Sequence, residues 1–361
     1  MVVKNSQSYR LLSLVAMSGE CSKEAMALLM PQESYRKKLL LQLMRDKLLK
    51  VYEKDGVMGY RLGRIGKETL LQIDHERFSF FLEDGADANM RRTKLPQRER
   101  QHRVSEVLAM MESSDAVIYR DRKNQIFGYG EKQTGEIAQS AFYLPNEVKE
   151  QTDLTRKIIN SKLAGVWQSE GAVWVCYNMG SQRMNWYENV ERRTGHLVCS
   201  VMREKGMESN AVSMILLGNS MEEALLCLDD PKSRTHFVNS FYKRVCFVPL
   251  DENGKQMLRL LGNAEMYEEL KIVLQEDLEK KGIGNIECDG IDPDGRYVLI
   301  LMDMDLKRLI RFCMQMRYIN GCGDVYCFDF QGEVVRRFCS KNITISELDF
   351  EKVSETLELN I

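Results

Sequence analysis

The sequence predicts a mixed α/β protein with several domains, and three observations support this fold class. The chain has 361 residues, which is too many for one small module and suits two or three domains. Hydrophobic residues make up 44% and charged residues 29% of it, as in proteins with a buried core. Helical patterns dominate the N-terminal part, whereas short strand-like runs alternate with helical ones from about Ser105.

Three helical segments open the chain, at residues 8–17, 23–30 and 35–48. Apolar side chains recur in them at three- and four-residue spacing, as on the buried face of a helix. Ser22 and Ser34 stand directly before the second and third segments, where a serine hydroxyl can accept hydrogen bonds from the first free backbone N–H groups. We therefore expect three short helices.

A β-hairpin is expected next. Two strand-like runs, 48–52 and 59–62, lie on either side of Asp55-Gly56, a dipeptide that favours the tight turn of a hairpin. Three helices followed by a β-hairpin is the order of elements in a winged helix-turn-helix domain. We predict this domain for residues 1–66.

The third helix is predicted to have two chemically distinct faces. Leu40, Leu43 and Met44 share the apolar face, and polar and basic residues lie about 200° away. In a helix-turn-helix, the second helix of the motif enters the DNA major groove with its N-terminal residues leading. The residues that we predict to contact DNA lie on this helix, on the hairpin and in the basic run that follows: Tyr35, Arg36, Lys37, Lys38, Gln42, Arg45, Lys54, Arg61, Arg91 and Arg92. The alternative is a solvated basic face on a domain that binds protein.

Residues 67–104 are predicted to hold a helix, at about 67–82, and a basic connector, at 91–103. Six of the thirteen connector residues are Lys or Arg and one is acidic. Residues 1–104 hold 20 basic and 13 acidic side chains, whereas the rest of the chain holds 31 and 40, so basic charge is concentrated at one end. This asymmetry favours a polyanionic partner for that end. The connector either adds phosphate contacts or is the exposed start of a following helix.

Residues 105–361 are predicted to form a larger α/β domain, as one domain or two subdomains. The strand-like runs are short and apolar and occur at 116–120, 141–144, 172–178, 245–250, 297–302 and 325–330. Helical patterns occur between them, at 154–163, 221–228, 255–261, 267–280 and 306–317. Buried strands that alternate with helices favour a mixed or mainly parallel sheet covered by helices.

Several classes of protein and site are not expected. The ten cysteines form no CxxC pair, which favours buried free thiols in a reducing compartment over a zinc site. The chain begins without the apolar segment of a signal peptide and has no run of about 18 apolar residues, so we expect a cytoplasmic protein that does not bind membranes. The phosphate-loop, dinucleotide-binding, serine-hydrolase and HExxH motifs are absent. We predict no catalytic residue, no metal site and no cofactor.

Four aspartates follow predicted strands and could bind a metal ion: Asp251, Asp303, Asp305 and Asp329. Ligands of open α/β sheets bind at the carboxyl ends of strands, where converging carboxylates can hold Mg²⁺ for phosphoryl chemistry. Aspartate is also a frequent helix N-cap, and Asp305 directly precedes the helical pattern at 306–317. The sequence leaves both interpretations open.

A second acidic set outlines a nuclease site of the restriction type. The triplet Glu147-Val148-Lys149 follows the strand-like run 141–144, and Asp115 and Asp121 lie near another such run. In sites of this type, carboxylates on a strand bind Mg²⁺ and a lysine positions the attacking water. Pro145 weakens the strand assignment, because proline cannot donate a backbone hydrogen bond to a neighbouring strand.

Short segments of the α/β region carry a family resemblance: AGVW at 164–167, VCYNMG at 175–180, MNW at 184–186, LGNSME at 217–222 and CFDFQ at 327–331. Together with the opening winged helix and the basic connector, they resemble the replication-relaxation type of protein found on plasmids and conjugative elements of Gram-positive bacteria. The resemblance extends over most of the chain and indicates no catalytic residue. It implies an accessory role in the replication, copy control or DNA processing of a mobile genetic element.

We therefore expect a non-enzymatic protein that binds double-stranded DNA through its winged helix. Its acidic C-terminal domain is expected to form a dimer or to recruit a protein partner. Two alternatives remain open at this point. One is a metal-dependent nuclease of restriction-like fold, and the other is a protein–protein interaction module that uses its winged helix.

Overall fold

In the computed structural model the chain divides into two compact units. Unit 1 comprises Met1–Gln168, Val175–Asn178 and Asn189–Met207, and unit 2 comprises Ser169–Trp174, Met179–Glu188 and Glu208–Ile361. The structure describes residues 2–83, 92–124, 126–127, 140–150, 161–204, 206, 212–228, 241–280 and 284–357. The predicted boundaries after residues 66 and 104 both lie within unit 1.

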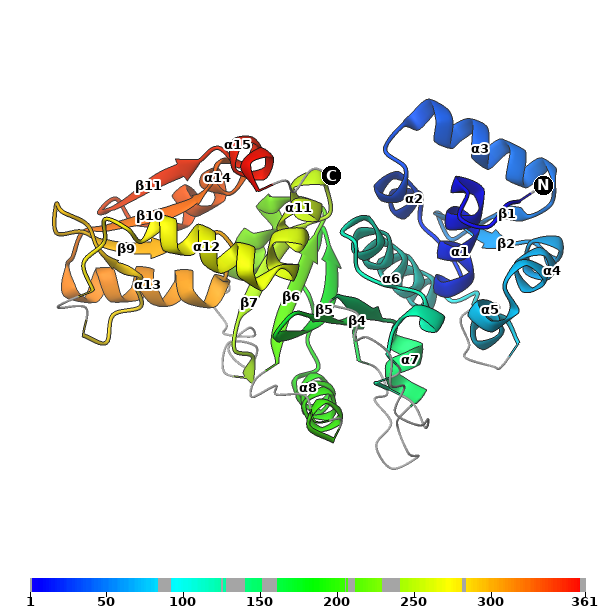
Figure 1. The fold of residues 1–361 in the computed structure, drawn as a ribbon, viewed down its shortest axis with the longest axis horizontal. Helices are drawn as coiled ribbons and strands as arrows, with labels where there is room; N and C mark the ends of the chain where they lie inside the picture. Colours follow the sequence, from blue (N-terminus) through cyan, green and yellow to red (C-terminus); the bar gives the residue numbers. More distant parts are fainter. Residues whose placement is uncertain are drawn as a thin grey trace. The chain divides into compact units, whose positions relative to one another are not determined.

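Unit 1 begins with three helices and a β-hairpin (Figure 1). Their bounds are α1 (Gln7–Ser18), α2 (Lys23–Leu29), α3 (Glu33–Arg45), β1 (Leu49–Lys54) and β2 (Val57–Leu62). The helices that follow are α4 (Arg64–Ile73), α5 (His75–Leu82) and α6 (Leu95–Ser113). Helix α1 is buried along almost its whole length, and α4, α5 and α6 contact it. It is therefore the central helix of this part of the core.

Local sequence signals set most of these boundaries. The Ser22 hydroxyl accepts a hydrogen bond from the backbone N–H of Ala25 at 2.9 Å and caps α2, as predicted. Asp55 and Gly56 have φ angles of 53° and 73°, and these left-handed conformations allow the two-residue turn that joins β1 to β2. The predicted cap at Ser34 is wrong, because α3 begins at Glu33 and places Ser34 inside its first turn.

The helix predicted at 67–82 is two helices, α4 and α5, that meet at Asp74. The backbone of Asp74 is extended, with a φ of −155° and a ψ of 76°, so a single helix cannot pass through it. Its carboxylate lies 2.7 Å from Lys4 Nζ and accepts a hydrogen bond from the Tyr9 hydroxyl at 3.3 Å. These contacts with the start of the chain favour the break over a continuous helix.

The middle of the chain adds strands and two further helices: β3 (Ala141–Tyr143), α7 (Pro145–Glu150), β4 (Leu163–Ser169), β5 (Ala172–Gly180) and α8 (Glu188–Glu204). A sheet of order β3-β4-β5-β6-β7 continues to β6 (Ser213–Gly218) and β7 (Val245–Pro249). Strand β3 runs antiparallel to β4, and β6 runs parallel to β7, so this sheet is mixed.

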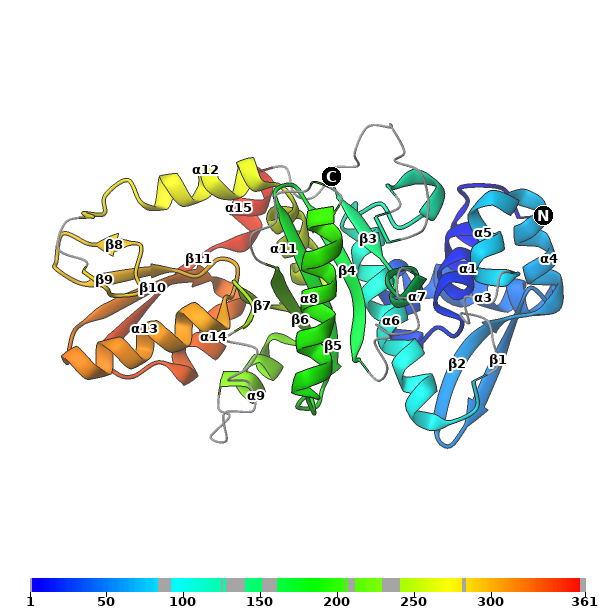
Figure 2. The ribbon, with the colours of Figure 1, turned by 90° about the horizontal axis from the view of Figure 1, so that it is seen from below.

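Unit 2 contains a second sheet, of order β11-β10-β9-β8. Strand β10 (Gly323–Phe328) is parallel to β9 (Tyr297–Ile300) and to β11 (Ile343–Leu348), and β8 (Gly290–Ile291) is antiparallel to β9. Helices α13 (Leu306–Ile319) and α14 (Asp329–Phe338) join the parallel strands. Figure 2 shows α12 (Ala264–Leu274) and α13 on opposite sides of this sheet. The remaining helices include α9 (Leu225–Leu228), α11 (Glu252–Gly262) and α15 (Phe350–Thr356).

The predicted mixed α/β class and mixed sheets are therefore confirmed. Two segments differ from the prediction. Residues 116–120 form no named strand and contribute only a single bridge, between Val117 and Ala141. The helical pattern at 154–163 ends inside β4, and residues 154–160 lie outside the described residues.

Candidate nucleic-acid interface

Helix α3 presents a polar and basic face to solvent. Leu40 and Leu43 are buried on its inner side, as predicted. On the outer side Tyr35 is 46% exposed and Leu41 is 64% exposed. The other predicted contacts on this exposed side are Lys37, Lys38, Gln42 and Arg45. The face therefore combines cations, an amide, an aromatic ring and one apolar side chain, which are the groups that contact phosphates and base edges in DNA complexes.

Neighbouring side chains on this face are linked to one another. Lys37 Nζ lies 2.6 Å from a carboxylate oxygen of Glu33, and this exposed ion pair lowers the pKa of Glu33. Gln42 donates a hydrogen bond to Asp46 at 2.7 Å and accepts one from Arg45. Exposed pairs of this kind contribute little to stability and exchange readily for other partners. Lys38 has no side-chain partner among the described residues, so its ammonium group already faces solvent.

Arg36 is placed differently from its neighbours. Its side chain is half-buried and turns back from the exposed face. Its guanidinium donates hydrogen bonds to the backbone carbonyl oxygens of Met30 and Pro31, the latter at 3.2 Å. Arg36 therefore fixes the turn between α2 and α3, and we leave it out of the proposed DNA-contacting set.

Of the residues outside α3 that were predicted to contact DNA, Lys54 is exposed and Arg61 is buried. Lys54 is exposed at the end of β1 and donates a weak hydrogen bond to the carbonyl oxygen of Thr93 at 3.5 Å. Arg61 is only 7% exposed, and its guanidinium binds the Glu20 carboxylate and the carbonyl oxygen of Arg92. Arg61 cannot reach a DNA phosphate without breaking these contacts. We therefore do not include Arg61 among the proposed DNA-contacting residues. Arg91 lies outside the described residues.

Glu20 is the centre of a buried charge network that the sequence did not indicate. Its carboxylate accepts hydrogen bonds from Arg61 at 2.6 Å and from Arg98 at 2.7 Å, and His102 Nε2 lies 2.9 Å from it. Arg98 also donates to the carbonyl oxygens of three hairpin residues, Tyr52, Lys54 and Val57. The network therefore attaches α6 to the hairpin.

The start of helix α6 bears on the interpretation of the connector. Helix α6 begins at Leu95, inside the basic run, so the interpretation as the start of a helix is the one that the structure shows. Arg98 is fully buried, which removes it from any contact with DNA. A spacing of four residues between Arg98 and His102 is the signal that was available in the sequence, because it places both side chains on one face of a helix.

The restriction-type nuclease outline does not form. Glu147 and Lys149 lie in helix α7 rather than on a strand. The Glu147 carboxylate is buried, pairs with Lys123 Nζ at 2.9 Å and accepts a hydrogen bond from the backbone N–H of Leu144 at 2.8 Å. Asp121 is held by Arg77 at 2.5 Å. Both acids are thus neutralised by a cation, and neither is placed to bind a metal ion.

Two of the four aspartates that follow predicted strands, Asp251 and Asp305, cap helices, whereas Asp329 is the first residue of α14. Asp251 accepts a hydrogen bond from the backbone N–H of Gly254 at 2.9 Å, and Asp305 accepts one from Lys307 at 3.0 Å. Asp303 is buried and accepts a hydrogen bond from the backbone N–H of Asp305 at 3.2 Å. In the ranges that the structure describes, no group of three or more His, Cys, Asp or Glu side chains could hold a metal ion.

Comparisons with known proteins leave the chain without a family. No protein-family model, curated protein or solved structure matches it.

Two further features bear on partners. Within the described parts of the chain, no helix combines the length and the apolar character needed to cross a bilayer. Unit 2 exposes large apolar side chains, with Ile272 and Val273 on α12 and Met314 and Tyr318 on α13. The association of the C-terminal region with itself or with another protein stays a prediction.

Proposed function

We propose that unit 1 binds double-stranded DNA through helix α3, as a winged helix-turn-helix protein. The exposed face of α3 is the observation that carries the proposal. It presents Lys38 and Arg45 to solvent on the side of the helix opposite the buried Leu40 and Leu43. The order of three helices and a hairpin, with Lys54 exposed at the hairpin end, supports the same assignment.

The role that we propose is accessory and non-enzymatic. The resemblance to replication-relaxation proteins favours a task in the replication, copy control or DNA processing of a mobile element. The pairing of Glu147 with Lys123 inside the core argues against the nuclease alternative. The apolar side chain of Leu41, in the middle of the exposed face, keeps a protein-binding role for the same helix as the second candidate.

Fluorescence anisotropy with labelled duplex DNA across a salt series tests the proposal. The double substitution Lys38→Ala and Arg45→Ala should weaken binding by roughly tenfold or more and reduce the salt dependence of the affinity, because each phosphate contact releases about one counterion. Arg64→Ala is the matched control, since Arg64 is an exposed cation on α4 whose side chain pairs only with Glu68 in the described structure, at 2.8 Å. Unchanged affinity in the double variant would exclude this face as the DNA reader. No binding at about 50 mM salt would favour the protein-binding role.

A further inference from the structure

A cavity of about 240 Å³ lies within unit 1, away from helix α3. Its walls come from the end of α1, from Arg92, and from α6 and α7. One water molecule needs only about 10–15 Å³ of such space, whereas pockets for drug-sized ligands measure about 300–1,000 Å³. The cavity therefore suits a ligand that is larger than water but still small.

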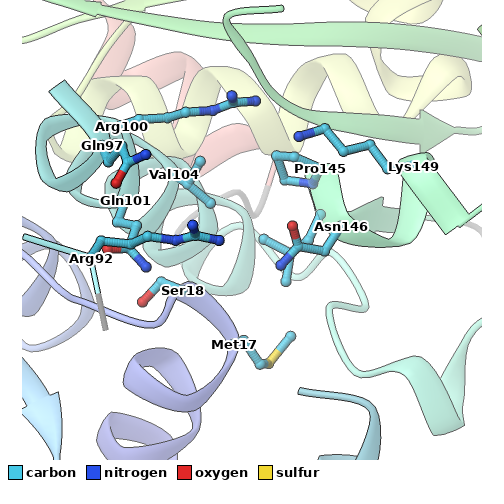
Figure 3. Close-up of a pocket in the computed structure, with 11 residues that line it drawn as sticks. Met17, Ser18, Arg92, Gln97, Arg100, Gln101, Val104, Pro145, Asn146 and Lys149 are labelled. Atoms are coloured by element: carbon cyan, nitrogen blue, oxygen red, sulfur yellow. The ribbon is translucent and has the colours of Figure 1, made fainter. Parts of the chain in front are cut away.

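Two helical faces supply most of the polar groups of this pocket. Gln97, Arg100 and Gln101 are three and four residues apart and share one face of α6. Asn146 and Lys149 are three residues apart and share one face of α7. Figure 3 shows the two sets on opposite sides of the pocket, with the polar ends of Arg100 and Lys149 directed towards each other.

The pocket is strongly basic. Arg92, Arg100 and Lys149 line it, and no acidic side chain is found among the lining residues that the structure describes. Arg100 carries the clearest sign of a missing partner, because its Nη2 atom is buried and meets no hydrogen-bond acceptor in the described part of the molecule. Burial lowers the pKa of Arg100, the charge of Glu191 raises it, and the charge of Arg92 lowers it again.

Glu191 does not supply the missing partner. Its two carboxylate oxygens already accept hydrogen bonds from the Ser161 hydroxyl at 2.8 Å, the backbone N–H of Lys162 at 2.9 Å and the Tyr177 hydroxyl at 2.8 Å. The acid is fully buried among these donors and does not line the pocket.

Several other buried cations of unit 1 are paired with carboxylates. Arg61 and Arg98 share Glu20, Arg77 pairs with Asp121, and Lys123 pairs with Glu147. A cation removed from water without an anion is costly, and proteins neutralise such charges by pairing them. A bound anion would neutralise the charge of Arg100, as the carboxylates neutralise the charges of the other cations.

We propose that this pocket binds a small ligand that carries a phosphate or diphosphate group. Guanidinium groups bind phosphate oxygens in a bidentate manner, and a lysine adds a point charge. The amides of Gln97 and Asn146 supply N–H donors around the same space. The proposal does not depend on DNA binding by α3, because α3 contributes no residue to the described lining. The volume of the pocket, about 240 Å³, suits a small ligand better than the backbone of a duplex.

Isothermal titration of the full chain with pyrophosphate, in magnesium-free buffer, tests this assignment. Pyrophosphate should bind the wild-type chain at one site. Arg100→Gln and Lys149→Gln should each weaken binding by roughly tenfold or more, the effect of removing a hydrogen bond between charged groups. Arg64→Gln should leave it unchanged. Arg100→Gln should not lower the melting temperature, since no ion pair of Arg100 is lost, and Lys149→Gln gives a second readout if the first variant unfolds.

Three results would overturn the proposal. The first is the absence of binding to the wild-type chain at millimolar pyrophosphate. The second is unchanged binding in both Arg100→Gln and Lys149→Gln. The third is displacement of pyrophosphate by duplex DNA together with an equal loss of DNA affinity in Arg100→Gln, which would assign the pocket to a backbone phosphate of DNA. Loss of pyrophosphate binding in these two variants, with DNA binding intact, would support the proposal whether or not α3 is the DNA reader.

Discussion

Replacing Glu20 with glutamine is expected to destabilise unit 1 by about 3–5 kcal/mol, the usual cost of removing one partner from a buried ion pair. The Glu20 carboxylate is fully buried and binds both Arg61 and Arg98. Glu20→Gln would leave two buried guanidinium groups facing one neutral amide. The amide nitrogen would also present a donor where an arginine already donates, so one buried contact would change from attraction to repulsion.

The pKa of Glu20 gives a second measure of this magnitude. Burial raises the pKa, but hydrogen bonds from His102, Arg98 and Arg61 outweigh this effect and lower it from 4.5 to about 2. A difference of about 2.5 pH units corresponds to about 3 kcal/mol of stability. The folded-state pKa lies below the unfolded one, so this stabilisation is complete above about pH 4.5 and is lost as the pH falls towards 2.

Urea unfolding of the intact chain, followed by circular dichroism at pH 7 and pH 3, measures both effects. The free energy of unfolding should differ between wild type and Glu20→Gln by about 3–5 kcal/mol at pH 7 and by less at pH 3. Glu68→Gln is the matched control, because it removes a carboxylate from the exposed pair with Arg64 and should cost less than about 1 kcal/mol. A Glu20→Gln variant within about 1 kcal/mol of wild type at pH 7 would refute the network as the attachment of α6 to the hairpin.

The remaining predictions concern packing, pairing and pH. Gly59→Ala should destabilise unit 1 by about 1–3 kcal/mol, because a Cβ at Gly59 would lie 2.3 Å from a carboxylate oxygen of Glu20; a wild-type melting temperature would contradict this. Lys123→Met should cost about 3–5 kcal/mol in urea unfolding, since it leaves Glu147 buried without its cation. Adding Glu147→Gln should recover part of that loss, and a double variant less stable than the single one would argue against the pair. Asp305→Asn should flatten the pH dependence of the melting temperature between about pH 4 and 7. Burial and the charge of Asp303 raise the pKa of Asp305 from 3.8 to about 7. Because the folded protein then holds the proton more tightly than the unfolded chain, the wild type should lose stability as the pH rises through this range. Equal slopes in wild type and variant would show that Asp305 does not titrate there.

The sequence predicted best the features that depend on neighbouring residues. The apolar spacing of α3 indicated its buried side, because periodicity records which face of a helix leaves water. Asp55 and Gly56 indicated the hairpin, since both residues tolerate the positive φ angles that the turn requires. The exposed positions of Lys38, Gln42 and Arg45 follow from the same helical geometry.

Features that depend on distant residues could not be predicted in this way. The sequence predicts that Arg61 is an exposed basic residue on a hairpin. In the structure Arg61 pairs with Glu20, which is 41 residues away in the sequence. The same limit applies to Glu147, whose partner Lys123 is 24 residues away and whose triplet with Lys149 is compatible with either a strand or a helix. A single sequence shows which residues are charged. It does not show which charged residues pair with one another, and this pairing determines whether they lie inside or outside the core.

The basic connector shows what this pairing means for experiments. Its composition suggests one cationic surface, but helix α6 separates its side chains, because Arg98 and Arg100 are two residues apart and project about 200° from each other. Arg98 joins the Glu20 network, whereas Arg100 lines the pocket with Arg92. Neutralising every basic residue of the connector would therefore also remove Arg98 and destabilise the packing of α6 on the hairpin. A loss of ligand binding in such a variant could not be assigned to Arg100. Arg100→Gln and Glu20→Gln separate the two roles, because the first should change anion binding without loss of stability and the second should change stability first.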